Sequence, residues 1–399
     1  MNRVARRQRP LRIALVWSQF GAYHIDRCEA VARRLTGKAQ VLAVEMATAT
    51  HTYAWEPSGD VAGARKITLF PGRNRESLSF GERFGAQLRV LRRCDYVFIG
   101  VPYSRSDVIA LSVTLRLLGV QVIAMNDSKF DDKQRSVLFE LVKSCVLVPY
   151  SAAIVAGARQ YRYMRFLGFR NRPVLPGYDT IGVKRVRAQS EQQVAPSGTP
   201  YEERDFLFVG RFVEKKNLPL LLAGYAQYVR LAGTMARRLV LAGSGPLEAE
   251  LRQMVLSLGI GEKVVFTGFL GPVDVARQLA QALALVLVSG EEQWGLVVNE
   301  AVALGLPVIA SLPVGAGDAL VRNMVNGLLV EPASKEGIAR SMLMLATDQA
   351  QWTRMAAASA QRAWFGDAER LADAVELILD PDAAAAGREM ARLRDTLGI

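Results

Sequence analysis

Two glutamates stand eight positions apart in the stretch 289–311, SGEEQWGLVVNEAVALGLPVIAS. Glu292 follows the apolar run 283–289, which is typical of a buried strand, and Glu300 falls on the second turn of a helix predicted over 296–304. In a parallel sheet this arrangement places both carboxylates near the carboxyl end of the strand, where ligands bind.

The residues between these glutamates supply a different kind of group. Trp294, Gly295 and Leu296 lie at the start of the predicted helix, and the first amides of a helix have no carbonyl partner within it and attract anions. One carboxylate can therefore accept hydrogen bonds from sugar hydroxyls and the other from a ribose diol, with phosphates on the amides between them. The alternative is that Glu292 is an ordinary loop carboxylate and Glu300 a surface helix residue.

Two cations follow another apolar run, 205–210, in the sequence VGRFVEKKN. Arg211 and Lys216 lie at the end of this predicted strand and just before a helical segment, where they can hold a diphosphate. A solvated loop, in which Arg and Lys are common, explains the same residues equally well.

The 399 residues exceed one typical core and suit two domains. Short apolar runs alternate with helical segments, which predicts two successive parallel sheets of the α/β class, each doubly wound. We expect strands at 11–17, 39–46, 95–100, 120–126, 145–150, 205–210, 238–243, 263–268, 283–289, 307–311 and 327–332.

A polar segment without periodicity, residues 187–204, divides the chain. We predict a first domain over 1–186, a linker or exposed loop over 187–204 and a second domain over 205–379. A terminal helix at about 380–399 is expected to pack back on the first domain. Two such domains would face each other across a cleft that holds the site.

The charge is unevenly distributed. Residues 1–190 carry 31 Lys and Arg against 14 Asp and Glu, a net +17, whereas residues 191–399 carry 19 against 24, a net −5. The first half therefore attracts nucleic acid, phosphorylated substrates or an anionic bilayer. Three scattered cysteines and two histidines indicate neither disulfides nor a zinc site, and we expect a cytoplasmic protein without signal peptide or membrane span.

Five motifs together resemble one family. VGRFVEKKN, LVLAGSGPLEAEL, VVFTGFL, EQWGLVVNEAVALGLPVIAS and NGLLVEP match, in order and spacing, the donor domain of retaining glycosyltransferases of family 4, which have the GT-B fold. The resemblance covers about residues 205–332 and identifies Glu292 and Glu300 as the E-x(7)-E pair of that family.

The resemblance implies roles for these residues. Glu292, a candidate catalytic residue, contacts the transferred sugar, Glu300 contacts the ribose, and Arg211 with Lys216 contacts the diphosphate of a nucleotide diphosphate sugar. The full set implied for the donor is Gly21, Arg211, Lys216, Phe269, Glu292, Trp294, Gly295, Leu296, Val297 and Glu300. The chain departs from the family at Asn217, where Gly is usual, at Trp294, where Phe is commoner, and at Asp318, where Glu is frequent.

The first half carries weaker signals. The loop SQFGAYHIDR follows the first strand, so His24 is a candidate catalytic residue, and Tyr23 and Arg27 are candidates on the acceptor side. His24 is equally well explained as a helix-start residue whose hydrogen bonds are satisfied locally. Gly21 permits close backbone approach.

A second loop, NDSKF, follows the strand predicted at 120–126 and continues into a segment that resembles family members acting on polysaccharide and glycolipid precursors. Asp127 is a candidate catalytic residue, and Ser128 and Lys129 are candidates on the acceptor side. Asp132 and Arg135 can instead form a salt bridge at a helix start.

Basic and aromatic residues interleave in the stretch 158–172, ARQYRYMRFLGFRNR. This composition suits an anionic bilayer surface, although an ordinary covering helix is the alternative. The net +17 of the first half favours the membrane, so we expect peripheral binding at the inner face of the plasma membrane.

The sequence thus predicts a retaining, metal-independent hexosyltransferase that uses a nucleotide diphosphate sugar, UDP- or GDP-linked, as donor substrate and needs no cofactor. The acceptor is expected to be a saccharide or a lipid-linked saccharide in cell-surface polysaccharide or glycolipid synthesis. The rivals are a nucleotide-sugar epimerase or hydrolase of the same architecture and a polyanion-binding protein, although no nucleic-acid recognition motif is visible.

Overall fold

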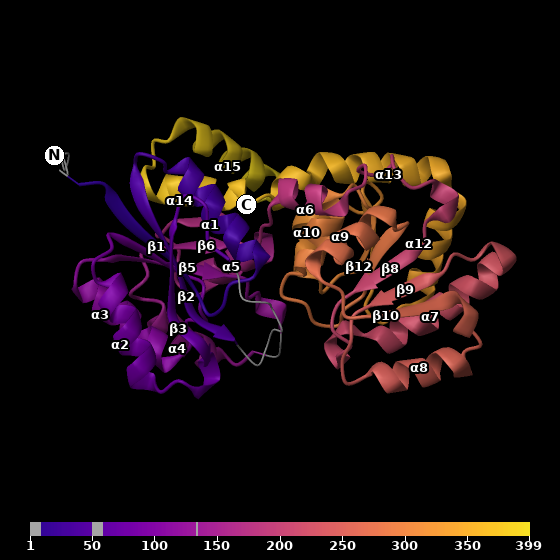
Figure 1. The fold of residues 1–399 in the computed structure, drawn as a ribbon, viewed down its shortest axis with the longest axis horizontal. Coiled ribbons are helices and arrows are strands. Elements are labelled where there is room, and N and C mark those ends of the chain that lie inside the picture. Colours follow the sequence, from indigo (N-terminus) through magenta and orange to yellow (C-terminus); the bar gives the residue numbers. More distant parts are fainter. Residues whose placement is uncertain (1–8, 50–58, 133–134) are drawn as a thin grey trace.

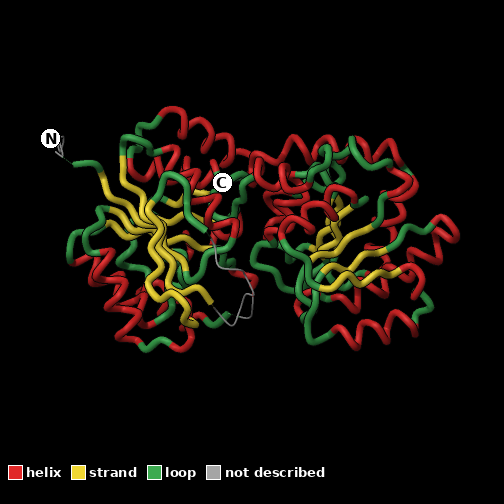
Figure 2. Tube along the Cα trace, viewed as in Figure 1, coloured by secondary structure: helices red, strands yellow, loops and turns green. Residues whose placement is uncertain are grey.

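The computed structural model describes residues 9–49, 59–132 and 135–399. In this part of the chain two sheets lie side by side along the long axis of the molecule, and helices cover each of them (Figures 1 and 2). Every strand pairing in both sheets is parallel. The predicted α/β class with two parallel sheets is therefore confirmed.

The first sheet has seven strands within the described residues, in the order β3-β2-β1-β4-β5-β6-β7. The order reverses between β1 and β4, so the loops after these strands open the crevice in which α/β sheets bind ligands. The strands are β1 (Leu11–Trp17), β2 (Ala39–Ala49), β3 (Arg65–Asn74), β4 (Tyr96–Ile99), β5 (Gln121–Asn126), β6 (Ala152–Val155) and β7 (Val174–Pro176).

Helices cover both faces of this sheet. Successive strand side chains point to opposite faces, so Leu15 packs with Val31 of α1, while Val16 belongs to a second cluster with Leu111 of α3 and Met164 of α5. Both faces are buried, which explains why β1 is a continuous apolar run. The helices are α1 (Ala22–Arg34), α2 (Phe80–Leu91), α3 (Ser106–Leu117), α4 (Val137–Val146) and α5 (Ala158–Phe166).

The second sheet has six strands in the described chain, in the order β10-β9-β8-β11-β12-β13, and reverses between β8 and β11. Its strands are β8 (Phe206–Val209), β9 (Leu239–Ala242), β10 (Val264–Gly268), β11 (Ala284–Leu287), β12 (Val308–Ser311) and β13 (Gly327–Val330). Its helices are α6 (Val183–Ser190), α7 (Leu218–Ala232), α8 (Glu248–Ser257), α9 (Pro272–Gln281), α10 (Leu296–Ala303), α11 (Gly315–Leu320), α12 (Lys335–Thr347) and α13 (Gln349–Arg362).

The chain passes between the domains at two adjacent segments. Ile181 forms a parallel bridge with Asp367, in which Ile181 N–H donates to Gly366 O at 2.9 Å and Ala368 N–H donates to Ile181 O at 2.8 Å. After this crossing, α14 (Glu369–Leu379) and α15 (Ala384–Leu397) lie over the first domain (Figure 1). Arg34 of α1 is ion-paired with Glu369 and Asp373 of α14. The return to the first domain therefore begins about ten residues before the expected helix at 380–399.

The predicted linker, 187–204, is not where the domains are joined. Its two ends and its midpoint are held by the second domain: Arg187 donates to Ala303 O at 2.8 Å, Ala195 N–H donates to Leu304 O at 3.0 Å, and Arg204 donates to the carbonyls of Ala280 and Ala282, both at 2.9 Å. The residues on either side of Ala195 are largely exposed. The polar, aperiodic sequence indicated a loop, but it did not indicate that the loop packs against the second domain.

One predicted strand is wrong. Residues 145–150 are the end of helix α4 and the turn after it, and the strand of this region, β6, begins at Ala152. The apolar residues of 137–148 that suggested burial are mostly exposed. Strands β3 and β7 were not predicted, because β3 carries charged residues and Pro at the sheet edge and β7 is only three residues long.

Candidate active site

The loops that follow β8 and β9 enclose a cavity of about 160 Å³. Arg211 and Phe269, which is 70% exposed, both line it. Gly243 lets the two loops approach closely, because its φ is +144° and a Cβ there would lie 1.9 Å from Gly210 O. The lining is Val209, Gly210, Arg211, Ala242, Gly243, Ser244, Phe269, Leu270 and Val275.

The predicted diphosphate cation and the predicted sugar carboxylate meet directly. Lys216 Nζ donates to Glu292 Oε2, and Ser289 Oγ donates to the same oxygen at 3.3 Å. Both charged side chains are largely buried, so each charge compensates the other in the absence of ligand. A phosphate would offer Lys216 a second anionic partner at this point.

Asn217 explains one departure from the family pattern. Its φ is +55°, in the left-handed region where Gly is favoured and Asn is the next most tolerated residue. Its Nδ2 donates to Val288 O at 3.2 Å and to Pro332 O at 2.9 Å. The side chain thus ties the turn before α7 to the ends of β11 and β13, and Asn keeps the backbone conformation that Gly would adopt.

Helix α10 begins at the predicted position. Gly295 precedes it with φ of +100°, and a Cβ there would lie 3.1 Å from Leu287 Cδ2, so Gly is required. Leu296 and Val297 then form the first turn, whose amides have no carbonyl partner within the helix. Their positive end lies directly after the Glu292 loop and suits an anion.

Trp294 packs against the first domain. Its ring is buried, its Nε1 donates to Asn299 Oδ1 at 2.9 Å, and a Cβ on Gly157 would lie only 3.0 Å from Cζ3 of the ring. Asn299 Nδ2 in turn donates to Asp179 O at 2.9 Å. The larger Trp in place of Phe therefore fills the contact between the Glu292 loop and helix α5.

Glu300 is buried at the domain boundary. Tyr23 OH of α1 donates to Glu300 Oε1 at 3.0 Å. Burial raises the pKa of Glu300 to about 7, while the Tyr23 hydrogen bond and the Arg185 guanidinium act in the opposite direction. Tyr23, predicted on the acceptor side, thus contacts the carboxylate predicted for the donor ribose. Sequence analysis did not single out Arg185, whose partner Asp26 is 159 residues away.

Asp127 faces the same boundary from the end of β5. Burial, with smaller contributions from the carboxylates of Asp132 and Glu292, raises the pKa of Asp127 to about 6, while Arg27 acts in the opposite direction. The pKa of Asp127 therefore responds to the charge of Glu292 in the second domain.

His24 is held by its own helix. Gly21 N–H donates to His24 Nδ1 at 3.0 Å, and the imidazole stacks on Phe20 with ring centroids 5.7 Å apart. Burial holds the pKa of His24 well below its usual range, so the ring is neutral near pH 7. This geometry matches the alternative of a locally bonded helix-start residue. Gly21 itself is buried with an ordinary φ of −114°.

Two residues predicted on the acceptor side are enclosed by protein. Arg27 donates to Thr180 O at 2.9 Å and to Asp179 Oδ1 at 3.2 Å, close to the domain crossing. Lys129 is fully buried, with its Nζ 3.3 Å from Asp132 Oδ1. A buried cation needs such compensation, so both side chains are committed to the fold. Ser128 lies beside them, partly exposed, and its N–H donates to Asn126 Oδ1 at 3.1 Å.

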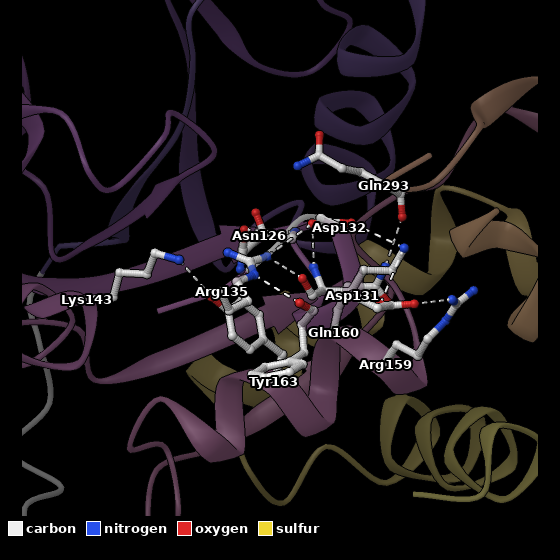
Figure 3. A network of polar contacts seen from close by, with 12 residues as sticks. Asn126, Asp131, Asp132, Arg135, Lys143, Arg159, Gln160, Tyr163 and Gln293 are labelled. Carbon is white, nitrogen blue, oxygen red and sulfur yellow. Dashed lines mark hydrogen bonds and ion pairs between the residues drawn. The ribbon is translucent and has the colours of Figure 1, made fainter. Parts of the chain in front are cut away.

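Arg159 joins the two domains, a role that sequence analysis missed. Its Nε donates to Asp318 Oδ2, its Nη2 donates to Leu312 O at 3.1 Å and to Val314 O at 2.9 Å, and its Nη1 donates to Asp131 Oδ2 at 2.7 Å. Figure 3 shows this arginine at one end of a polar network that also contains Gln160 and Gln293. Asp318, which stands where Glu is frequent in the family, is thus ion-paired with Arg159.

The basic and aromatic stretch 158–172 is mostly structural. Tyr163 and Phe169 are buried, and Arg165 and Arg172 donate to backbone carbonyls of their own neighbourhood. Within this stretch the exposed arginines and aromatics are Arg162, Phe166 and Arg170. Much of this segment therefore matches the alternative of an ordinary covering helix, and the membrane surface stays a prediction. No helix in the described ranges is both long and apolar enough to span a bilayer.

Comparison with known families finds a match in the second domain. The family model described as "Glycosyl transferases group 1" matches residues 189–362. This part of the chain, less than half of it, is therefore similar to group 1 glycosyl transferases. It contains the cavity, the Lys216–Glu292 pair and helix α10, and the resemblance carried by the five motifs is confirmed.

Named glycosyltransferases match part of this chain. D-inositol 3-phosphate glycosyltransferase 1 of Catenulispora acidiphila is 33% identical over 192 residues, which are 45% of this chain and 46% of that protein. A lipopolysaccharide core biosynthesis glycosyltransferase of Rhizobium meliloti is 32% identical over 158 residues, 40% of this chain and 44% of that protein. The matched stretches therefore span less than half of these relatives.

Solved structures match over both domains. Sucrose-phosphate synthase from Thermosynechococcus elongatus superimposes with a TM-score of 0.68 at 22% identity, covering 94% of this chain and 100% of that one. Anabaena HepE in complex with UDP-glucose superimposes with a TM-score of 0.68 at 14% identity, covering 93% and 100%. The stretch that the group 1 model matches is therefore part of a GT-B fold, as the resemblance implied.

Proposed function

We propose that this chain is a glycosyltransferase that moves a sugar from a nucleotide diphosphate sugar to a saccharide or lipid-linked acceptor, with retention at the anomeric carbon. The observation that carries this proposal is that Arg211 lines a cavity, Lys216 pairs with Glu292, and the first turn of α10 follows the Glu292 loop, all within the stretch that the group 1 model matches. The complex of Anabaena HepE with UDP-glucose supports a nucleotide sugar as donor.

In this proposal the donor lies along the carboxyl edge of the second sheet. The base stacks on Phe269, and the diphosphate binds Arg211, Lys216 and the amides of α10, where the cations and the helix end neutralise charge. Glu292 accepts hydrogen bonds from the transferred sugar, and Glu300 accepts them from the ribose. These contacts place the anomeric carbon at the boundary between the domains.

The transfer step then requires no covalent bond between the sugar and the protein. The bond between the anomeric carbon and the β-phosphate oxygen breaks, and its electron pair remains on the phosphate. The acceptor oxygen bonds to the same face of that carbon, and its proton passes to the leaving phosphate. Asp127, whose pKa is about 6, can accept a hydrogen bond from the acceptor hydroxyl and orient it. His24 is neutral and stabilises the conformation of the loop that follows β1.

We further propose that the reaction is metal-independent and takes place in the cytoplasm at the inner face of the plasma membrane. The metal-independent step follows from the cations and amides that face the diphosphate. A membrane location suits an acceptor in lipopolysaccharide or glycolipid synthesis, and one relative is named for lipopolysaccharide core biosynthesis.

The test is an assay of nucleoside diphosphate release from a panel of UDP- and GDP-sugars, with and without saccharide and glycolipid acceptors and in the presence of a chelator. We expect acceptor-dependent release that the chelator does not reduce. Nuclear magnetic resonance of the product should show the same anomeric configuration as the donor. Release or isomerisation of the donor without any acceptor would instead indicate a hydrolase or epimerase.

A further inference from the structure

Helix α4 buries a charged side chain and exposes its apolar ones, which is the reverse of an ordinary surface helix. Glu140, at its centre, is 4% exposed, whereas Leu138 is 72%, Phe139 70% and Leu141 60% exposed. Val142 is also exposed. A surface helix normally buries its apolar stripe and leaves charges in water. Here the apolar residues face outward over the whole length of the helix.

The inward face of α4 is held by charged and polar contacts. Glu140 accepts hydrogen bonds from Lys143 Nζ at 2.7 Å and from Tyr163 OH at 2.5 Å, and Lys143 Nζ also donates to Tyr163 OH at 3.0 Å. Arg135 lies over the Tyr163 ring, 4.9 Å from its centroid. Figure 3 shows Lys143, Arg135 and Tyr163 converging at one end of the network. If α4 rotated about its own axis, these groups would lose their partners. The contacts therefore fix which side of α4 points outward.

The outward face of α4 continues onto the neighbouring segment. Phe130 and Phe166 are more than half exposed, and their ring centroids lie 5.7 Å apart. Both line a hollow of about 370 Å³ together with Tyr163, the exposed Arg162, and the ion-paired Asp131 and Arg159. Tyr163 contacts both Phe130 and Glu140 of α4, and we call the exposed apolar residues of α4 together with Phe130 and Phe166 the α4 face. Exposed apolar areas of this kind mark interaction sites, and this one is bordered by arginines.

We propose that the α4 face docks on an anionic bilayer, with α4 lying in the plane of the interface. Ten residues at a rise of about 1.5 Å give roughly 15 Å, half of the about 30 Å that a spanning helix needs, so α4 can lie on the membrane but not cross it. The net +17 of residues 1–190 complements anionic lipid. The same charge would repel a second copy placed face to face.

This docking would orient the candidate active site. Tyr163, which anchors α4, and Arg159, which pairs with Asp318, both lie on α5. The hollow between them opens beside the α4 face. If the proposed function holds, a lipid-linked acceptor could present its saccharide to the domain boundary without leaving the leaflet. The docking itself does not depend on the proposed function.

The test uses the protein's own cysteines. Cys145 is exposed and continues the stripe of Leu138, Leu141 and Val142, whereas Cys28 and Cys94 are buried. A polarity-sensitive fluorophore on Cys145 of the full chain should shift to the blue with vesicles of phosphatidylcholine and phosphatidylglycerol. The shift should decrease with added salt, since the Debye length is about 8 Å at physiological ionic strength. An equal shift with vesicles of phosphatidylcholine alone would overturn the proposal that the partner is an anionic bilayer.

A matched pair of variants tests the face itself by vesicle co-sedimentation without donor. Leu138→Gln with Leu141→Gln should lower the partition coefficient about tenfold or more, because two leucines lose their favourable transfer from water. Leu231→Gln with Leu256→Gln makes the same chemical change at exposed leucines of the second domain and should leave partition within about twofold. Equal partition of both variants would overturn the proposal.

Two further readouts complete the design. Light scattering should not show a dimer of the parent that becomes a monomer in the α4 variant. Such a change would mean that the α4 face is an interface between two copies of the chain. Transfer to a water-soluble acceptor should be unchanged in the α4 variant. If vesicles bind as expected but no donor is turned over by the parent, the proposed function fails and the docking proposal stands.

Discussion

Tyr23 OH, on α1 of the first domain, donates a 3.0 Å hydrogen bond to Glu300 Oε1, on α10 of the second. This bond places a residue of the loop after β1 on the carboxylate proposed for the donor ribose. Arg185 and Asp26 stand next to it and contribute opposing charges. If the proposed function holds, donor binding and the contact between the domains involve the same carboxylate.

The first prediction concerns pH and stability. Burial raises the pKa of Glu300 from its ordinary 4.5 to about 7, so the folded state binds more protons than the unfolded state between these values. The stability that protonated Glu300 contributes is present below about 4.5 and is lost as pH rises through about 7. We expect Glu300→Gln to unfold at a higher temperature than the parent above pH 7, by at most about 3 kcal/mol in free energy, and to lose this advantage near pH 4.5. A pH-independent difference in melting temperature would contradict the shifted pKa.

The second prediction separates the two glutamates. Glu300→Gln should weaken binding of the free nucleoside diphosphate, because a carboxamide oxygen is a poorer acceptor for a ribose diol than a carboxylate. Glu292→Gln should largely spare nucleotide binding and lower the rate of transfer, because its proposed partner is the sugar. Calorimetric titration and initial rates on the same preparations make the comparison. Equal loss of nucleotide affinity in both variants would show that the roles are wrongly divided.

The third prediction concerns the diphosphate cations. Arg211→Ala and Lys216→Ala should each lower turnover roughly 30-fold to 1000-fold, the equivalent of about 2 to 4 kcal/mol of lost charge stabilisation. Lys335→Ala, an exposed lysine on the same domain, serves as control and should retain parental turnover. Normal melting temperatures would show that folding is intact. Near-parental turnover by a folded double variant of Arg211 and Lys216 would remove these residues from the site.

The fourth prediction concerns the bridge between the domains. Arg159→Met and Asp318→Asn should each lower the transfer rate, and the double variant should be little worse than either single one, with a coupling of about 1 to 3 kcal/mol. The reason is that both residues belong to one contact that holds α5 against the loop before α11. Small-angle scattering with saturating nucleotide should show a larger radius of gyration for the variants than for the parent. Fully additive effects on rate would indicate that the pair does not act as a unit.

The second domain could be predicted well from the sequence. All six of its strands fall on predicted runs, because strands buried on both faces must be continuously apolar. The positions of Glu292 and Glu300 around the start of α10 were also predicted, since a strand end, a positive-φ Gly and a helix start fix one another locally. Asn217 could be understood only from its backbone angle.

The first domain was less predictable for identifiable reasons. The apolar residues around α4 indicated a buried strand, but the helix exposes them, and no local pattern distinguishes a membrane-facing stripe from a core-facing one. Arg159 pairs with Asp131 and Asp318, which are 28 and 159 residues away. Arg27 and Lys129 looked like acceptor contacts because they follow strands, but their burial depends on carboxylates brought close by the fold.

Thermal stabilisation by nucleotide sugars tests the central claim most directly. A ligand at about 100 times its dissociation constant adds roughly 2.7 kcal/mol of stability, which is readily visible in a melting curve. We predict that at least one UDP- or GDP-sugar raises the melting temperature of the parent and that Arg211→Ala with Lys216→Ala abolishes this rise. If no nucleotide diphosphate sugar stabilises the parent, or if the double variant is stabilised equally, the cavity beside Arg211 and Phe269 is not a donor site.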